Sequence, residues 1–199
     1  MKHTLQVFAA ARETVLALAI SLLFSFAANA QHSSDAHSAA LDKCCSFSFS
    51  FVAMDAKGGP VYDAKGDVVV SGARFRVEIP HQMIVVSDGV TQWVYNSSND
   101  EILISGSEFS QQMASASTPL EMVEKVVELF VGANKGYEKV LNKDKAGNLV
   151  EVVLKWAKGS YVMKILGPIV EKKTPPEMFS LDVRNFPEAV ITDLRKPLL

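Results

Sequence analysis

The sequence contains few of the residues from which metal and redox sites are built. It has two cysteines and four histidines among 199 residues. None of them shows the spacing of a metal site, and the HExxH, GxSxG, P-loop and GxGxxG motifs are absent. We therefore expect no metal site, no cofactor and no enzymatic activity.

The sequence also lacks a dominant sign of charge and a second long apolar run. Its 20 basic and 22 acidic residues give a formal charge of −2, which argues against a strongly basic nucleic-acid-binding protein. An apolar content of 48% excludes an intrinsically disordered chain. A single apolar run excludes a membrane protein with several spans.

The one long apolar run lies at the N-terminus. Basic Lys2 and Arg12 come before the run Val15–Phe26, and Ala28-Asn29-Ala30 matches a small-x-small cleavage site. This order predicts a secretory signal peptide over residues 1–30, cleaved before Gln31, and one domain over residues 31–199. A run of about 12 residues is short for a bilayer, so an N-terminal anchor is the less favoured alternative. In a Gram-negative cell, the exported protein would be periplasmic.

The two cysteines, Cys44 and Cys45, are neighbours in the sequence. Their Cα atoms are about 3.8 Å apart, whereas ordinary disulfides need about 4.4–6.8 Å. This spacing favours two buried or half-buried free thiols. A strained vicinal bridge and an intermolecular bridge remain as alternatives.

Apolar residues alternate with polar ones along most of the remaining chain. Phe47, Phe49 and Phe51, for example, alternate with serines, which is typical of a strand with one buried and one solvent-exposed face. The same period predicts strands at 46–53, 62–70, 74–79, 83–87, 91–95, 101–105, 137–142, 150–156, 160–165 and 179–184. Short turns between them favour about nine to eleven antiparallel strands in one strongly curved sheet or open barrel, a mainly β (α+β) fold.

The alternation is interrupted once, by a helical block. Glu108–Ala116 has helical spacing, and Thr118 with Pro119 predicts a capped start of a second helix that ends before Gly132. That second helix is apolar on more than half of its circumference, so we expect it to cover a broad apolar face as a lid.

Two groups of polar residues are candidates for chemistry or docking. His81 and Asp88 form a candidate acid–base pair of an exported hydrolase, although both occupy predicted turns. Arg74, Arg76 and Glu78 form a charged row on one strand, which is either a solvated face or a docking strip. The abundant large apolar residues, with 11 Phe and 7 Met, fit either a core or the wall of a ligand cavity.

Three stretches carry a family resemblance. Gly66–Val70, Arg74–Arg76 and Val85–Asn96, the last containing Ser-Asp-Gly-x-Thr-x-Trp-x-Tyr, resemble the LolA family of periplasmic lipoprotein carriers. Phe179–Val183 and Val190–Arg195 are similar to the last strand and tail of its Bacteroidetes-type members, and the resemblance spans Ser46–Arg195. It implies an unclosed barrel with a helical lid over an apolar cavity. It further implies a monomeric carrier that takes acylated lipoproteins from an inner-membrane ATP-driven releasing complex to the outer membrane, where an acceptor is a candidate partner.

The resemblance and the alternation together give the expected site. The residues expected to line the acyl-chain cavity are Phe47, Phe49, Phe51, Phe75, Val77, Ile84, Val86, Trp93, Ile102 and Ile104. Those expected in the lid are Phe109, Met113, Leu120, Met122, Val126, Leu129 and Phe130. In many members a basic residue followed by proline stands where this chain has Ser71-Gly72, and that basic residue helps to hold the lid closed. Arg74 and Arg76 are candidates to make this contact with the lid instead. The alternative function is a lipid-binding sensor of envelope stress with the same fold.

Overall fold

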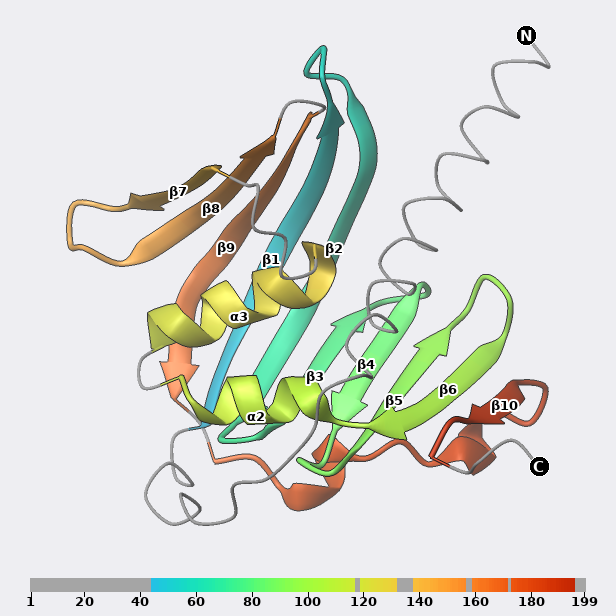
Figure 1. Ribbon diagram of the computed structural model, residues 1–199. Helices are drawn as coiled ribbons and strands as arrows, with labels where there is room; N and C mark the ends of the chain where they lie inside the picture. Colours follow the sequence, from blue (N-terminus) through green and yellow to red (C-terminus); the bar gives the residue numbers. More distant parts are fainter. Residues whose placement is uncertain (1–43, 117–118, 132–137, 157–158, 172, 196–199) are drawn as a thin grey trace, which may run out of the picture. The chain divides into compact units, whose positions relative to one another are not determined.

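The computed structural model describes residues 44–116, 119–131, 138–156, 159–171 and 173–195 (Figure 1). The strands are β1 (Cys44–Asp55), β2 (Pro60–Ser71), β3 (Arg74–Ile79), β4 (Met83–Ser87), β5 (Thr91–Asn96), β6 (Glu101–Gly106), β7 (Glu138–Lys143), β8 (Leu149–Trp156), β9 (Gly159–Glu171) and β10 (Val190–Asp193). The helices are α2 (Glu108–Ala114) and α3 (Pro119–Val131), with 3-10 turns η1 (Pro176–Phe179) and η2 (Val183–Asn185). In these ranges no helix has the length and apolarity needed to cross a membrane. The predicted signal peptide and Thr118 fall outside them, and the signal peptide stays a prediction.

The ten strands form one sheet in the order β10-β6-β5-β4-β3-β2-β1-β9-β8-β7. Pairs from β2 to β6 and from β7 to β9 are antiparallel, whereas β10 runs parallel to β6. No pairing among the described residues joins β10 to β7, so the sheet is not closed. The predicted mainly β fold, number of strands and open sheet are confirmed, but the expectation of a wholly antiparallel sheet is wrong at β10.

One predicted strand, over residues 179–184, does not exist. The chain makes two 3-10 turns here, of which the first follows Pro175 and begins at Pro176; neither proline has an N–H to donate to a ladder. Phe179 and Leu181 are nevertheless buried, while Ser180 and Asp182 are exposed. An extended segment that lies on an apolar surface therefore has the period of two without any strand partner.

The chain divides into two compact units. The described part of unit 1 comprises residues 49–64 and 123–166, and that of unit 2 comprises residues 44–48, 65–122 and 167–195. Strands β1, β2 and β9 contribute residues to both units, and each unit is described by itself below.

Unit 1 is built around the aromatic residues of its strands. The buried Phe51 ring stacks on Tyr161 at 5.6 Å and lies at a tilt to Tyr62 at 6.2 Å. On α3, the residues that share one helical stripe are almost completely buried, which agrees with the predicted apolar face: Val123, Val126 and Val127.

Candidate ligand-binding faces

The strand register divides the buried residues of unit 2 between two faces of the sheet. Val77 pairs with Val68 and with Val85, and Val85 pairs with Val94, so these residues share one face. We call it the helix face. Its members in β2 to β5 are Val68, Val70, Phe75, Val77, Ile79, Met83, Val85, Ser87, Gln92, Val94 and Asn96. The opposite side, called the strap face, has as members Arg74, Arg76, Glu78, Ile84, Val86, Trp93, Tyr95, Ile102 and Ile104.

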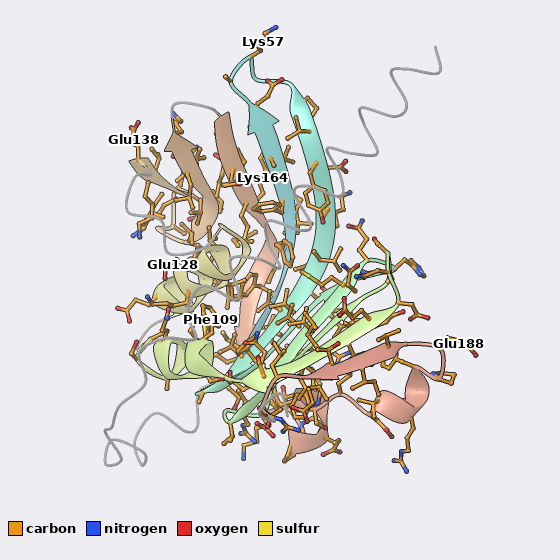
Figure 2. All side chains as sticks on the ribbon, turned by 45° about the vertical axis from the view of Figure 1, so that its right-hand side comes forward. Lys57, Phe109, Glu128, Glu138, Lys164 and Glu188 are labelled. Carbon is orange, nitrogen blue, oxygen red and sulfur yellow. The ribbon has the colours of Figure 1, made fainter. Side chains whose placement is uncertain are left out.

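Helix α2 packs on the helix face. The Phe109 ring, labelled in Figure 2, meets the fully buried Phe75 ring edge-on, with 5.3 Å between their centroids. An edge-to-face arrangement at this distance is favourable for aromatic pairs. Met113, one turn further along α2, is completely buried. The Phe109–Phe75 contact therefore fixes α2 to the sheet, and the next turn of the helix buries Met113.

The strap face is filled by the C-terminal strap, residues 175–195. Leu181 is buried in a cluster with Val86, Ile102 and Ile104. Further residues of the strap and the sheet pack against this cluster: Val183, Phe186, Ala189, Ile84, Trp93 and Tyr95. The protein's own chain thus occupies this face as part of the folded core.

Tyr95 connects the strap to the β5–β6 turn. Its ring centroid lies 4.4 Å from that of Phe186, and its hydroxyl donates to Asp100 at 3.1 Å. Desolvation, followed by this hydrogen bond, raises the pKa of Tyr95. Tyr95 therefore acts as a protonated donor that holds the end of the strap.

The ten residues predicted for the cavity wall do not line one surface. Phe75 and Val77 lie on the helix face. The predicted wall residues on the strap face are Ile84, Val86, Trp93, Ile102 and Ile104. Alternation assigns faces within a strand, but only the register relates one strand to the next. The remaining three, Phe47, Phe49 and Phe51, are buried in β1.

A hydrogen bond across β1 and β2 assigns Phe47 to the helix face. The Ser48 hydroxyl donates to the Asp67 carboxylate at 2.5 Å, so both side chains lie on the same side of the sheet. Asp67 pairs with Glu78, which is on the strap face. Because neighbouring residues in a strand point to opposite sides, Phe47 shares the helix face with Val68.

The predicted lid residues occupy both helices. Phe109 and Met113 lie on α2, as described above, and Val126 is buried on α3. The buried Met122, in the first turns of α3, accepts a hydrogen bond from the Cys45 thiol with 3.3 Å between the sulfurs. Leu120, Leu129 and Phe130 belong to α3, but their side chains lie outside the described part of the structure. The lid function stays a prediction.

Arg74 and Arg76, considered for a lid contact, lie across the sheet from α2. The Arg74 guanidinium is 5.1 Å from the centre of the Phe179 ring, in the strap, and donates to the Ser71 hydroxyl at 3.2 Å. Arg76 donates twice to Glu78, at 2.7 and 3.1 Å. Both arginines therefore face away from α2, and Arg74 helps hold the strap.

The candidate acid–base pair, His81 and Asp88, is not brought together. The two residues flank opposite ends of β4, whose five residues span about 17 Å. Asp88 accepts hydrogen bonds from the Val90 and Thr91 amides in the β4–β5 turn. Among the described residues, no group of three His, Cys, Asp or Glu side chains is arranged to hold a metal ion.

Cys44 and Cys45 are both free and buried, which confirms the prediction of two buried thiols. Burial, with smaller effects of Cys44 and Glu171, raises the pKa of Cys45 to about 11. Cys44 lies 2.9 Å from the Thr174 hydroxyl. The thiols therefore serve as small packing residues at the start of β1.

The residues of the Ser-Asp-Gly-x-Thr-x-Trp-x-Tyr stretch have structural roles. The Ser87 hydroxyl donates to the Thr91 carbonyl at 2.9 Å and accepts from the Gly89 amide at 3.1 Å. Its oxygen also lies 2.8 Å from that of Ser107 and 2.7 Å from that of Ser110, at the start of α2. The stretch therefore forms the β4–β5 hairpin and joins it to α2, while its aromatic residues support the strap.

Gln92 was not recognised from the sequence. It lies on the helix face, opposite Ser87 on one side and Ser105 on the other, and only 6% of it is exposed. Within the described residues its side-chain amide has no hydrogen-bond partner, although burying such a group costs about 1–3 kcal/mol. Every fully buried side-chain nitrogen and oxygen in that part of the chain is paired, so the Gln92 amide must keep some contact with solvent. The available signal was the position of Gln92 two residues before Val94, because alternation in a strand places both side chains on one face.

Comparisons with known proteins provide no family for the chain. No protein-family model matches it, and no curated protein matches it. The chain is similar to the crystal structure of an uncharacterized conserved protein from Thermus thermophilus, with 10% identity and a TM-score of 0.43 over 77% of this chain and 91% of that one. A likeness at this TM-score carries no weight for the fold or the function.

Proposed function

We propose that the protein is a periplasmic carrier that binds the acyl chains of lipoproteins and moves them from the inner to the outer membrane. The observation that carries the proposal is a mainly apolar helix face on an unclosed sheet, on which the seven-residue helix α2 packs in unit 2. The signal-peptide pattern and the resemblance over Val85–Asn96 support the same function. In this function the inner-membrane releasing complex loads the carrier.

The acyl chains would lie against the helix face, where Phe47, Phe75 and Val77 are buried. The Phe109 ring of α2 contacts this face now, and cargo would lie between the sheet and Phe109 once α2 moves aside. The strap face is excluded as the cargo surface because its apolar residues form a cluster with the strap.

Such a carrier needs no catalytic residue. Burial of acyl chain contributes about 0.8 kcal/mol per CH₂ group, so about 45 such groups would exceed the roughly 20 kcal/mol ceiling of real affinities. Complete burial would also prevent release. A carrier needs only to compete with the membrane, with loading driven by an external motor and unloading by a better acceptor.

The test is capture of a synthetic peptide whose N-terminal cysteine carries three palmitoyl chains. The purified protein is expected to form a complex that survives size-exclusion chromatography. F109A is the test variant, and F186A is its matched control. Both phenylalanines are half-buried and in aromatic contact, but Phe109 contacts the helix face and Phe186 the strap face.

F109A should lower the amount of captured peptide, because it removes apolar contact from α2, whereas F186A should leave capture unchanged. Absence of any complex with this peptide or with a triacylated lipoprotein would refute the function. A larger loss in F186A than in F109A would place the cargo on the strap face and contradict the proposed site.

A further inference from the structure

The helix face is not apolar throughout. Val85 and Val94 pair on it, but the next position along β5 on the same face is Gln92. Gln92 is nearly as buried as Val94, at 6% against 4% exposed. Its amide lacks a hydrogen-bond partner within the described residues, yet it retains contact with solvent. The face therefore has a polar group at the margin of an apolar surface, open to a partner from outside the protein.

The neighbouring side chains do not satisfy this amide. The Ser87 hydroxyl, on β4, uses its proton on the Thr91 carbonyl and accepts from the Gly89 amide. Ser105, on β6, is half-buried opposite Gln92, and its hydroxyl has no hydrogen-bond partner in the described part of the chain. Gln92 and Ser105 thus form an adjacent pair of unused polar side chains on one face.

We propose that Gln92 and Ser105 form a subsite for the amide group of an N-acylated ligand, the group that links the acyl chain to the rest of that ligand. This inference rests on the proposed function, because it concerns the polar end of the same ligand. A glutamine amide offers one donor group beside one acceptor, and a secondary amide offers the complementary pair. An ester supplies acceptors only, and a hydrocarbon supplies neither. The subsite therefore selects an N-acyl group over an O-acyl group of the same length.

The experiment compares three probes with the same number of heavy atoms: N-methyldodecanamide, methyl dodecanoate and n-pentadecane. Each displaces 11-(dansylamino)undecanoic acid from the purified full chain, and the readout is the ratio of their dissociation constants. The parent protein should bind the amide most tightly. Q92M keeps the length of the side chain but cannot form the two hydrogen bonds. Its preference for the amide over the hydrocarbon, measured as the ratio of the two dissociation constants, should therefore fall about tenfold.

Stability separates this role from a structural one. Because Gln92 has no partner to lose within the described chain, Q92M should keep or raise the melting temperature. The matched control is Q82M, the same substitution in the β3–β4 turn, which should leave the preference unchanged. S105A provides a second, smaller change at the subsite and should reduce the preference in the same direction.

An unchanged amide preference in both Q92M and S105A would overturn the subsite while leaving the carrier function intact. Binding of none of the three probes by the parent protein would instead refute the proposed function, and the subsite with it.

Discussion

The contact between Phe75 and Phe109 gives a quantitative test of how α2 is attached to the sheet. Phe75 is completely buried, and its ring is 5.3 Å from that of Phe109 in an edge-on arrangement. A pair of this kind contributes about 0.5–1.5 kcal/mol beyond the area it buries. F75L should lower the free energy of unfolding by about 1–2 kcal/mol. F109L, at a half-buried position, should lower it by less.

The double variant should be more stable than the sum of the single effects predicts, by the coupling energy of about 0.5–1.5 kcal/mol. Urea unfolding followed by tryptophan fluorescence measures all four proteins. A second cycle pairs F75L with Y95L as the control, because Phe75 lies on the helix face and Tyr95 on the strap face. That control cycle should be additive. A coupling below about 0.3 kcal/mol in the first cycle, or an equal coupling in both, would refute the assignment of the two faces.

Three further outcomes follow from single contacts. R74M removes the guanidinium over the Phe179 ring and should lower the free energy of unfolding by about 1 kcal/mol. Proteolysis of the strap should become faster, and an unchanged rate of proteolysis would contradict the contact. S87A removes the hydroxyl that joins the hairpin to α2 and should cost about 1–3 kcal/mol in thermal unfolding, whereas a neutral result would show that the hydroxyls are not coupled. For Cys45, whose pKa of about 11 exceeds the ordinary 9.0, alkylation by iodoacetamide at pH 8 should be at least about 100-fold slower in the native than in the urea-unfolded protein. Equal alkylation rates in the native and unfolded protein would refute the burial of this thiol. Since the folded state favours the protonated thiol, the contribution of Cys45 to stability is fully present below pH 9 and is lost as the pH rises towards about 11.

The sequence predicted the strands well where apolar and polar residues alternate along the strand. The bounds predicted for β3 and β4 agree with the structure, because charged and apolar residues alternate in β3 and Asp88-Gly89 closes the hairpin after β4. Phe109 and Met113, spaced by one helical turn, likewise predicted the apolar side of α2, on which Phe109 contacts Phe75 and Met113 is buried.

The faces could not be predicted across strands. Val85 and Val86 are both buried because both faces of the sheet are covered, so their hydropathy does not show which one faces α2. The strap had no separate signal, since Phe179 and Leu181 have the spacing of a strand. Relating these segments required the hydrogen-bond register, which depends on contacts between residues far apart in the chain.

The parallel pairing of β10 with β6 has a consequence for the order in which the protein folds. Val190 lies beside Glu101 in the register, 89 positions later in the chain. The edge of β6 and the apolar strap face therefore stay uncovered until residues 175–193 have been synthesised. Contacts of such long range form late. Unit 2 thus remains incompletely folded throughout most of its synthesis, which is the state that the proposed export through a membrane would require.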